Sequence, residues 1–271
     1  MTIADIPRIA LQAADSGAQA LRRHFGRLTR IDKKGAIDLV TEADLAAEAA
    51  ILATLRRHCP DHSVLAEESG RTPGSQSACW IVDPLDGTTN FAHGLPIFAV
   101  SIAFAEDGRI LHGVVLNPMG EELFQATAGA GATLNGRSIR VSTTQRLDEA
   151  LLATGFPYNL HNVMDSLMDR LSAALRVGQG IRRLGAAALD LCHVACGRFD
   201  GFWEESLKPW DTAAGALLVG EAGGRVTDLS LDSFAPEKAS IVATNGLIHE
   251  RLVEALNSQP AVPLRHREVG R

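Results

Sequence analysis

Apolar side chains recur at helical spacing in several separate stretches of the chain. In residues 7–25 they recur every two to four residues, at Ile9, Leu11, Ala14, Ala18, Leu21 and Phe25. This pattern predicts an amphipathic helix at the start of the chain. The segment from Thr41 to Asp44 is typical of a helix start, and we expect that helix to continue from Leu45 to Leu55. Further helices are predicted at 163–176, 186–195, 211–221 and 247–256.

Short β-rich segments lie between these helices and are separated by Gly, Asp-Gly and Asn-Pro turn signals. The first group predicts an antiparallel meander, with strands at 63–66, 79–83, 97–105, 110–116 and 121–126. Later strands are predicted at 199–204, 225–227 and 241–243. Helices, then strands, then an alternating α/β half indicate stacked layers rather than a barrel. We expect a single domain over residues 1–258, with packed halves at about 1–145 and 146–258, and a flexible tail over 259–271.

Composition narrows the class of protein. The chain has 271 residues, of which 46% are hydrophobic and 21% charged, as in a soluble globular enzyme. The formal net charge of −6 argues against a nucleic-acid surface, which needs clustered Lys and Arg. The start of the chain has no signal-peptide pattern, and no stretch approaches the ~18 uncharged apolar residues of a membrane span. We therefore expect a cytoplasmic protein without a membrane or nucleic-acid partner.

The cysteines indicate a reducing environment. None of the four, Cys59, Cys79, Cys192 and Cys196, forms a Cys-x-x-Cys pair. Buried free thiols are therefore favoured over a disulfide or a zinc site.

Acidic residues gather where predicted strands end. A buried strand leads directly to Asp83, and Asp86 follows three residues later, before a glycine. Two carboxylates at the end of a buried strand repel each other and lose hydration, so a partner must compensate them. A simple turn is the alternative, because Pro-x-Asp-Gly is also a common turn sequence.

Two more acidic clusters shift the balance toward a metal site. Glu67 and Glu68 follow a second short apolar strand, and Asp211 stands at a predicted helix start. Taken singly, Asp211 could be an N-cap and the two glutamates a solvated loop. Together, the three clusters fit one site for a hard cation such as Mg²⁺, which prefers oxygen ligands and leaves positions for water and phosphate.

These motifs resemble the signatures of the inositol monophosphatase family, and most closely its bacterial members. The first signature corresponds to Asp83-Pro84-Leu85-Asp86-Gly87-Thr88-Thr89-Asn90-Phe91. The second corresponds to Trp210-Asp211-Thr212-Ala213-Ala214-Gly215 with Glu221-Ala222-Gly223-Gly224. Two shorter motifs match in the family's order, at Glu67-Glu68-Ser69 and from Asp38 to Asp44. The likeness covers about residues 5–257 and implies an αβαβα sandwich of the inositol monophosphatase and fructose-1,6-bisphosphatase type.

The resemblance implies two or three Mg²⁺ ions, held by Glu67, Asp83, the Leu85 carbonyl, Asp86 and Asp211. Asp83 would bridge the first two ions, and Glu67 would contact a third. One ion would activate water while another stabilises the leaving alkoxide. Thr88 would bond the attacking water, with Asp44 accepting its proton through the Thr hydroxyl.

The remaining implied roles concern the substrate. Gly87 and Thr88 would bind phosphate through backbone N–H groups, and Glu204 would bind ring hydroxyls. The substrate edge would run along Arg182, Gly185, Ala186 and Ala187, with Glu67, Leu85, Asp86 and Asp211 also reaching the substrate. The sequence departs from the family at positions that would contact the alcohol part of the substrate. Ala186 stands where relatives often have Ser or Thr, and Ser206 stands where they commonly have Gly. These departures leave the metal ligands untouched and concern only which alcohol is held.

The predicted function is therefore Mg²⁺-dependent hydrolysis of a small phosphorylated polyol, and myo-inositol monophosphate is the leading candidate substrate. Histidinol phosphate and fructose 1,6-bisphosphate are alternatives, and 3′-phosphoadenosine 5′-phosphate is disfavoured for want of a second basic cluster. A dual role as an interaction protein also stays open. The resemblance implies lithium inhibition and a homodimer, for which Leu151 to Pro157 and Arg182-Arg183 are candidate interface segments.

Overall fold

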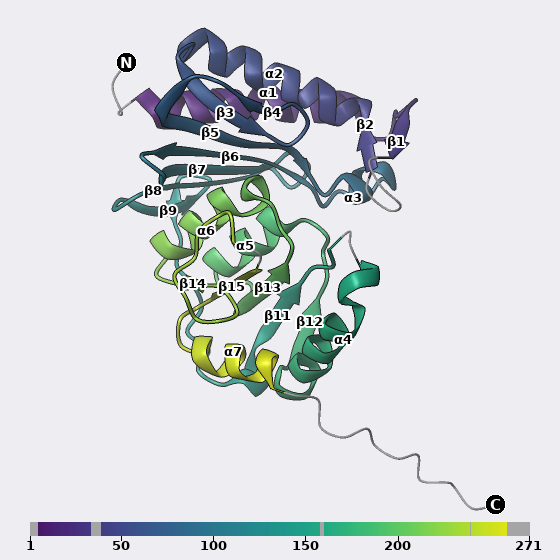
Figure 1. Ribbon diagram of the computed structural model, residues 1–271, viewed down its shortest axis with the longest axis vertical. Helices are drawn as coiled ribbons and strands as arrows, with labels where there is room; N and C mark the ends of the chain where they lie inside the picture. Colours follow the sequence, from purple (N-terminus) through teal and green to yellow (C-terminus); the bar gives the residue numbers. More distant parts are fainter. Residues whose placement is uncertain (1–4, 34–38, 158–159, 239, 259–271) are drawn as a thin grey trace, which may run out of the picture.

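The computed structural model describes residues 5–33, 39–157, 160–238 and 240–258. Helices and strands alternate in five layers (Figure 1). Helices α1 and α2 cover one face of an eight-stranded sheet, and α5 and α6 separate it from a five-stranded sheet whose outer face carries α4 and α7. The predicted αβαβα sandwich is confirmed.

The helices of the described part are α1 (Ile6–His24), α2 (Glu42–His58), α3 (Thr88–Ala92), α4 (Leu160–Val177), α5 (Ala187–Ala195), α6 (Pro209–Glu221) and α7 (His249–Asn257). Every predicted helix is present. The short helix α3 begins at Thr88, where the family resemblance implied a helix start, whereas the 3₁₀ turn at Leu147–Glu149 was not predicted.

The eight-stranded sheet has the order β10-β9-β8-β7-β6-β5-β3-β4. Its strands are β3 (His62–Ala66), β4 (Gly70–Thr72), β5 (Ser75–Asp86), β6 (Ala99–Glu106), β7 (Arg109–Asn117), β8 (Glu122–Thr127), β9 (Gly131–Leu134) and β10 (Arg137–Ser138). Strands β5 to β8 form the predicted antiparallel meander, which β9 and β10 extend without having been predicted. The strand at 63–66 was wrongly included in the meander, because β3 runs parallel to β5. A separate two-stranded sheet pairs β1 (Ile31–Lys33) with β2 (Leu39–Thr41).

The five-stranded sheet has the order β12-β11-β13-β15-β14. Its strands are β11 (Leu151–Thr154), β12 (Gly180–Arg182), β13 (Gly201–Glu205), β14 (Arg225–Thr227) and β15 (Ser240–Thr244). Strand β11 runs parallel to β12 and β13 and lies between them. Leu152, Ala153 and Thr154 are buried inside this sheet and offer no surface to a partner, while the rest of the predicted interface segment from Leu151 to Pro157 stays a prediction.

The middle layer joins the two halves closely. Gly215 on α6 faces Leu191 on α5, where an added Cβ would lie 2.6 Å from Leu191 side-chain atoms. Gly113 on β7 likewise faces Ala214, at 3.0 Å from its Cα. Small residues therefore let α6 approach both neighbours, and one hydrophobic cluster takes side chains from both halves. The single domain over residues 1–258 stays a prediction, and the tail predicted at 259–271 lies outside the described residues.

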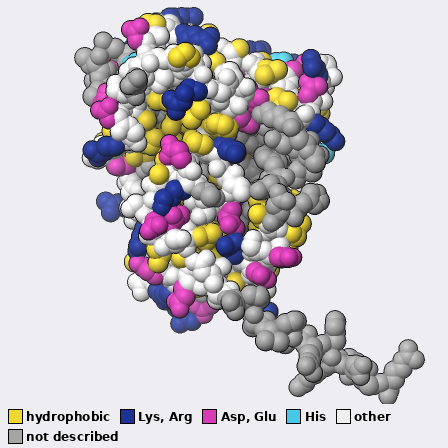
Figure 2. All heavy atoms as spheres, viewed as in Figure 1, with side chains coloured by type: hydrophobic (Ala, Val, Ile, Leu, Met, Phe, Trp, Pro, Cys, Tyr) yellow, Lys and Arg dark blue, Asp and Glu magenta, His cyan; other side chains and the backbone are white. Residues whose placement is uncertain are grey.

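The expectation of buried free thiols holds in part, because Cys59 and Cys192 are buried whereas Cys79 and Cys196 are half-buried. All four cysteines are free thiols. No helix among the described residues is long and apolar enough to cross a membrane. On the face drawn in Figure 2, Lys and Arg side chains are interspersed with Asp and Glu rather than gathered in one basic region.

Candidate active site

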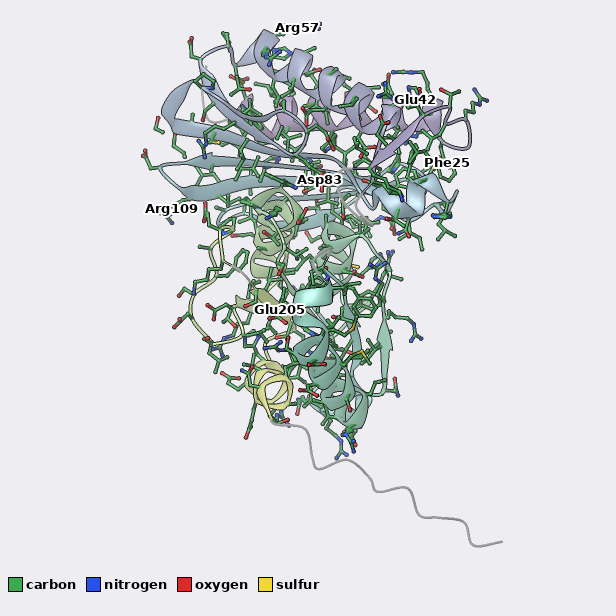
Figure 3. All side chains as sticks on the ribbon, turned by 45° about the vertical axis from the view of Figure 1, so that its right-hand side comes forward. Phe25, Glu42, Arg57, Asp83, Arg109 and Glu205 are labelled. Carbon is green, nitrogen blue, oxygen red and sulfur yellow. The ribbon has the colours of Figure 1, made fainter. Side chains whose placement is uncertain are left out.

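Strand β5 delivers two carboxylates to the junction between the eight-stranded sheet and the layer beneath it (Figure 3). Between Asp83 and Asp86 the register with β6 shifts, because Pro84 has no N–H with which to continue the ladder. Asp83 is only 1% exposed, and its Oδ1 accepts a hydrogen bond from Leu85 N at 2.9 Å. The end of this strand is thus irregular, buried and acidic.

Asp86 reaches across to the second half of the molecule. Its Oδ1 accepts from Ala187 N at 3.2 Å, and its Oδ2 accepts from Ala188 N at 2.8 Å. These N–H groups belong to the first turn of α5, where the helix has donors without partners of its own. One carboxylate therefore fixes the position of α5 relative to β5.

Thr88 and Asp44 form a buried pair. The Thr88 hydroxyl is 3.0 Å from Asp44 Oδ1 and 3.1 Å from the Leu85 carbonyl oxygen, and either oxygen can accept its proton. Asp44 Oδ2 accepts from Thr41 N at 2.8 Å within the capping box that begins α2. The start of α2 thereby places a carboxylate behind the Thr88 hydroxyl.

The other acids come from three different elements. Glu67 follows β3, and its N–H donates to the Val82 carbonyl of β5 at 3.1 Å. Asp211 lies in the first turn of α6, where its Oδ2 accepts from Lys208 N at 2.6 Å. Glu204, 8% exposed, lies near the end of β13.

These elements enclose one cavity of about 250 Å³. Most of the predicted site residues line it, namely Glu67, Asp83, Leu85, Asp86, Gly87, Thr88, Gly185, Ala186, Ala187, Glu204 and Asp211. A larger open groove of about 620 Å³ lies along the other side of α6, but Glu237 is the only acid in its lining. The acidic cavity is therefore the better candidate for chemistry.

Two predicted residues do not line the cavity. Asp44 is fully buried behind Thr88. Arg182 is exposed in β12, and its guanidinium donates to the neighbouring Ile181 carbonyl at 3.1 Å. The next residue, Arg183, lines the cavity instead and lies over the Phe156 ring at 5.3 Å. The strand ends at Arg182, so the chain turns toward the site one residue later than expected.

The electrostatics of the cavity favour a bound cation. Burial raises the pKa of Asp83 well above its usual range, and the charges of Glu67, Asp86 and Asp211 raise it further. Burial also raises the pKa of Asp86 to about 7, against the lowering effect of the α5 N–H groups. The pKa of Glu204 rises to about 8, through burial first and then Asp211 and Asp86. A positive ion would relieve this mutual repulsion.

The donor chemistry fits a hard divalent cation, since the four acids Glu67, Asp83, Asp86 and Asp211 line one cavity and offer carboxylate oxygens. Across the described ranges, no three His, Cys, Asp or Glu side chains are arranged as a ready-made metal-binding group. Asp83 and Asp86 come from β5, whereas Glu67 follows β3 and Asp211 lies on α6. The metal ligand set therefore stays a prediction.

Sequence reasoning missed two buried polar groups that support the site. The Asn90 amide donates to the carbonyls of Ile97 and Leu184, each at 2.8 Å, and so ties α3 to the segment before α5. Glu48 on α2 accepts from Glu68 N at 2.9 Å. Asn90 lies inside the first signature, and Glu48 lies one helical turn after Asp44. Both positions were visible in the sequence, but their partners were not.

Comparison with known proteins gives consistent matches. A model of the inositol monophosphatase family matches residues 4–261. An inositol-1-monophosphatase of Synechocystis is 46% identical, covering 93% of this chain and 88% of that protein. The Nus factor SuhB of Pseudomonas aeruginosa is 47% identical, covering 94% of this chain and 96% of that protein.

Solved structures agree with this result. The extragenic suppressor protein suhB of Bartonella henselae superposes with a TM-score of 0.90 at 42% identity, over 93% of this chain and 98% of that one. An inositol monophosphatase of Anabaena gives a TM-score of 0.85 at 43% identity, over 94% and 96%. The resemblance drawn from the four motifs is confirmed.

Proposed function

The chain belongs to the inositol monophosphatase family and is a phosphoric monoester hydrolase, and from that premise we propose that it converts myo-inositol monophosphate to inositol and phosphate with Mg²⁺. One observation carries this proposal. The carboxylates of β5, α6 and the β3–β4 turn share a single cavity with Glu204, a buried acid outside the proposed metal set. A cavity that combines metal ligands with a separate acceptor suits a phosphate ester of a polyol.

The metal ligands would be those that the family resemblance implied. Glu67, Asp83 and the Leu85 carbonyl would hold one ion, and Asp83, Asp86 and Asp211 a second, with Glu67 contacting a third. Bound Mg²⁺ supplies a Lewis acid for the phosphoryl oxygens and lowers the pKa of water.

The protein's own contribution to proton transfer would lie in the Thr88–Asp44 pair. The Thr88 hydroxyl has one proton, which it can give to Asp44, and its oxygen could then accept a hydrogen bond from a water. Asp44 is held in place by Thr41 and cannot turn away. A water seated at Thr88 could thus pass a proton toward Asp44, while the Gly87 and Thr88 N–H groups orient the phosphate.

Recognition of the alcohol would fall to the opposite wall. Glu204 would accept hydrogen bonds from ring hydroxyls, with Gly185, Ala186 and Ala187 along the substrate edge. Arg183 takes the place that we had assigned to Arg182, because it is the arginine in the cavity lining.

A panel of phosphate-release assays tests the proposal. The substrates are myo-inositol 1-phosphate, histidinol phosphate, fructose 1,6-bisphosphate and 3′-phosphoadenosine 5′-phosphate, each with Mg²⁺ and with excess EDTA. We expect the highest kcat/KM for the inositol ester and no turnover in EDTA. A higher kcat/KM for another ester would make that ester the preferred substrate. Undiminished turnover in EDTA would contradict the proposed Mg²⁺ dependence.

A second candidate function is interaction with a protein partner alongside catalysis. It is favoured by the relative from Pseudomonas aeruginosa, which is named as a Nus factor rather than as a phosphatase. The catalytically impaired Asp83→Asn chain would separate the two functions. Complementation of a strain lacking this protein by Asp83→Asn would support the second role, and failure of a well-folded variant to complement would argue against it.

We also propose a two-fold homodimer, the commonest assembly of soluble proteins. Light scattering at micromolar concentration should give about twice the single-chain mass of 28.8 kDa. A mass equal to that of one chain would contradict the dimer.

A further inference from the structure

Glu48 is a buried carboxylate that the proposed reaction does not use. It lies on α2 with 5% of its surface exposed, and its Oε2 accepts a hydrogen bond from the backbone N–H of Glu68 at 2.9 Å. The two residues are twenty positions apart in the chain. A buried acid that spans this distance to bind a backbone group holds that segment in place.

The segment that it holds is the turn that presents Glu67 to the cavity. Strand β3 ends at Ala66, which pairs with Gly70 of β4, so residues 67–69 form a tight connection. The Glu67 N–H donates to Val82 on β5, and the following N–H, of Glu68, donates to Glu48. The peptide groups on both sides of the Glu67 Cα are therefore fixed, one by the sheet and one by α2. This sets the direction in which the Glu67 side chain leaves the backbone.

The same helix also fixes the other end of the site. Asp44 precedes Glu48 by four residues, so both side chains project from one face of α2, the face that packs on the sheet. Asp44 holds the Thr88 hydroxyl, and Glu48 holds the Glu67–Glu68 turn. Helix α2 thus supports both Thr88, which is proposed to bond the attacking water, and Glu67, which is proposed to bind metal.

We propose that Glu48 is a positioning residue that sets Glu67 for metal binding by accepting the Glu68 N–H. The inference rests on the proposed metal-dependent function. It assigns the effect to the reach of the side chain and its acceptor oxygen, and not to its negative charge. Gln keeps both the reach and an acceptor, whereas Asp keeps the charge but is one methylene too short to reach the N–H.

The test compares Glu48→Gln, Glu48→Asp and Glu48→Ala with the wild type. Two quantities are measured: the Mg²⁺ concentration for half-maximal activity, and the rise in Tm that Mg²⁺ causes without substrate. Loss of a residue that orients a metal ligand typically costs about 10–100-fold in metal affinity, so Asp and Ala should raise the Mg²⁺ requirement at least about tenfold. They should also reduce the Mg²⁺-induced rise in Tm. Gln should stay within about threefold of wild type, because a neutral acceptor replaces most of a single hydrogen bond.

Glu42→Ala is the matched control. Glu42 lies at the start of the same helix, and its carboxylate also accepts a loop N–H, that of Thr29 at 2.7 Å, but it lies outside the cavity lining. This variant should change the Tm of the metal-free protein and leave the Mg²⁺ requirement unaltered.

Three outcomes would overturn the inference. One is a wild-type Mg²⁺ response in Glu48→Asp and Glu48→Ala, and another is a Gln variant as impaired as Ala. The third is a Glu42→Ala control that shifts the Mg²⁺ requirement as much as Glu48→Ala. If Glu48→Ala does not fold, Gln and Asp decide the question alone. A wild-type protein that responds to no Mg²⁺ would instead refute the proposed function itself.

Discussion

The two walls of the cavity are built in different ways. On the wall from the first half, Asp83, Asp86 and Thr88 fall within six residues of one another, and each makes a hydrogen bond that fixes its orientation. On the wall from the second half, Glu204 and Gly155 come from separate strands or their ends. Among the described residues, the Glu204 carboxylate has no hydrogen bond, and it is held by close packing on Gly155.

This contrast suggests a division of labour. Groups that handle charge and protons need a fixed geometry, which local hydrogen bonds supply. A group that recognises an alcohol needs free acceptor capacity, which Glu204 retains. Changes to Asp83, Asp86 or Thr88 should therefore abolish turnover of every ester, as should a change to Asp211, the proposed metal ligand from the second half. Changes to Glu204 or Gly155 should instead alter the choice among esters.

Asp83→Asn is the strongest test of the first wall. A neutral amide would replace the carboxylate proposed to bridge two cations, and the repulsion between those cations would grow. Losing several kcal/mol of barrier stabilisation corresponds to a rate loss of ~10³-fold or more. Steady-state assays should show this loss equally for inositol phosphate and p-nitrophenyl phosphate. A loss of activity with only one of the two substrates would contradict the proposed separation of catalysis and substrate recognition between the two walls.

Glu204→Gln tests the second wall. A cation bound beside Asp86 and Asp211 would lower the raised pKa of Glu204, so with metal present the substitution keeps the shape but turns a charged acceptor into a neutral one. Hydrogen bonds to charged groups contribute about 1.5–3 kcal/mol, so kcat/KM for inositol phosphate should fall about ten- to a hundredfold. Hydrolysis of p-nitrophenyl phosphate, which has no ring hydroxyls, should barely change. Equal losses would place Glu204 in the catalytic machinery, and no loss would remove it from recognition.

Gly155→Ala disturbs the same wall without touching a carboxylate. An added Cβ would lie 1.9 Å from Glu204 Oε2, so the Glu204 side chain must turn aside. We expect about a tenfold loss for inositol phosphate, as for one misplaced hydrogen bond, and little change for the aryl ester. Gly220→Ala on α6 is the control, because an added Cβ there meets no atom within 4 Å. Similar kinetics in the two variants would contradict the packing role of Gly155.

The walls also differ in how far the sequence could predict them. Asp83, Asp86 and Thr88 share one short motif, so their proximity follows from chain connectivity. The layered fold likewise followed from local periodicity in the helices and the meander. Strands β11 and β12 escaped prediction because their parallel partners lie far along the chain, and a run such as residues 151–154 does not reveal them.

Long-range contacts explain the remaining errors. The support that Glu48 gives to the turn at Glu68 depends on how α2 lies across the sheet, which no local pattern encodes. Whether Arg182 or Arg183 faces the cavity depends on the residue at which β12 ends. A shift of one residue reverses the side to which a strand side chain points.

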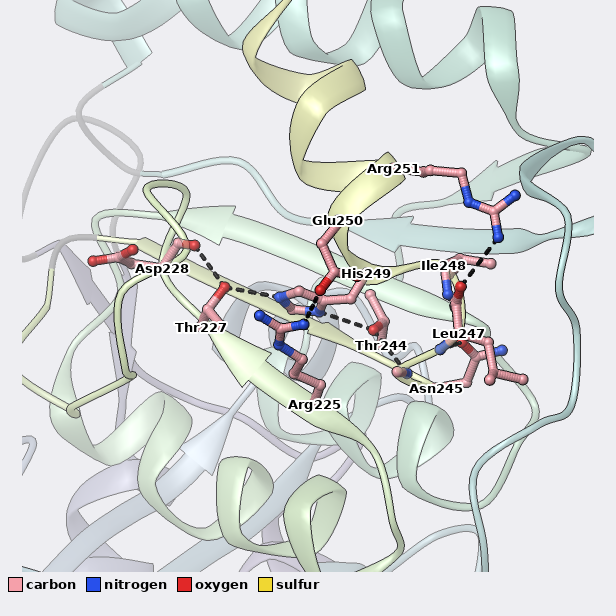
Figure 4. Close-up of polar contacts among 11 residues, drawn as sticks. Arg225, Thr227, Asp228, Thr244, Asn245, Leu247, Ile248, His249, Glu250 and Arg251 are labelled. Atoms are coloured by element: carbon pink, nitrogen blue, oxygen red, sulfur yellow. Dashed lines mark hydrogen bonds and ion pairs between the residues drawn. The ribbon is translucent and has the colours of Figure 1, made fainter.

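The final comparison concerns how the stability of the half behind the second wall depends on pH. His249 is fully buried at the start of α7, with Nε2 2.9 Å from Thr227 Oγ1 and Nδ1 2.9 Å from Thr244 Oγ1 (Figure 4). Thr227 gives its own proton to the Asp228 carbonyl, so it accepts from Nε2–H, and Thr244 donates to Nδ1. These bonds suit a neutral ring, and they join α7 to β14 and β15.

The sign of the pH effect follows from the pKa of His249. Burial, with a smaller contribution from Arg225, lowers this pKa from 6.5 to about 4, so between these values the unfolded chain binds more protons than the folded one. The free energy of unfolding should therefore be at its full value above pH 6.5 and fall as the pH drops toward 4, by at most about 1.4 kcal/mol per pH unit. His112 and His193, whose pKa values burial also lowers to about 4, add to the same slope. Urea unfolding of wild type and His249→Gln at pH 7, 6 and 5 isolates one contribution, because Gln cannot titrate. The variant should be less stable at pH 7 and lose less stability on acidification. An identical pH slope in the two proteins would show that His249 does not contribute to the pH dependence of the free energy of unfolding, which would then come from other groups.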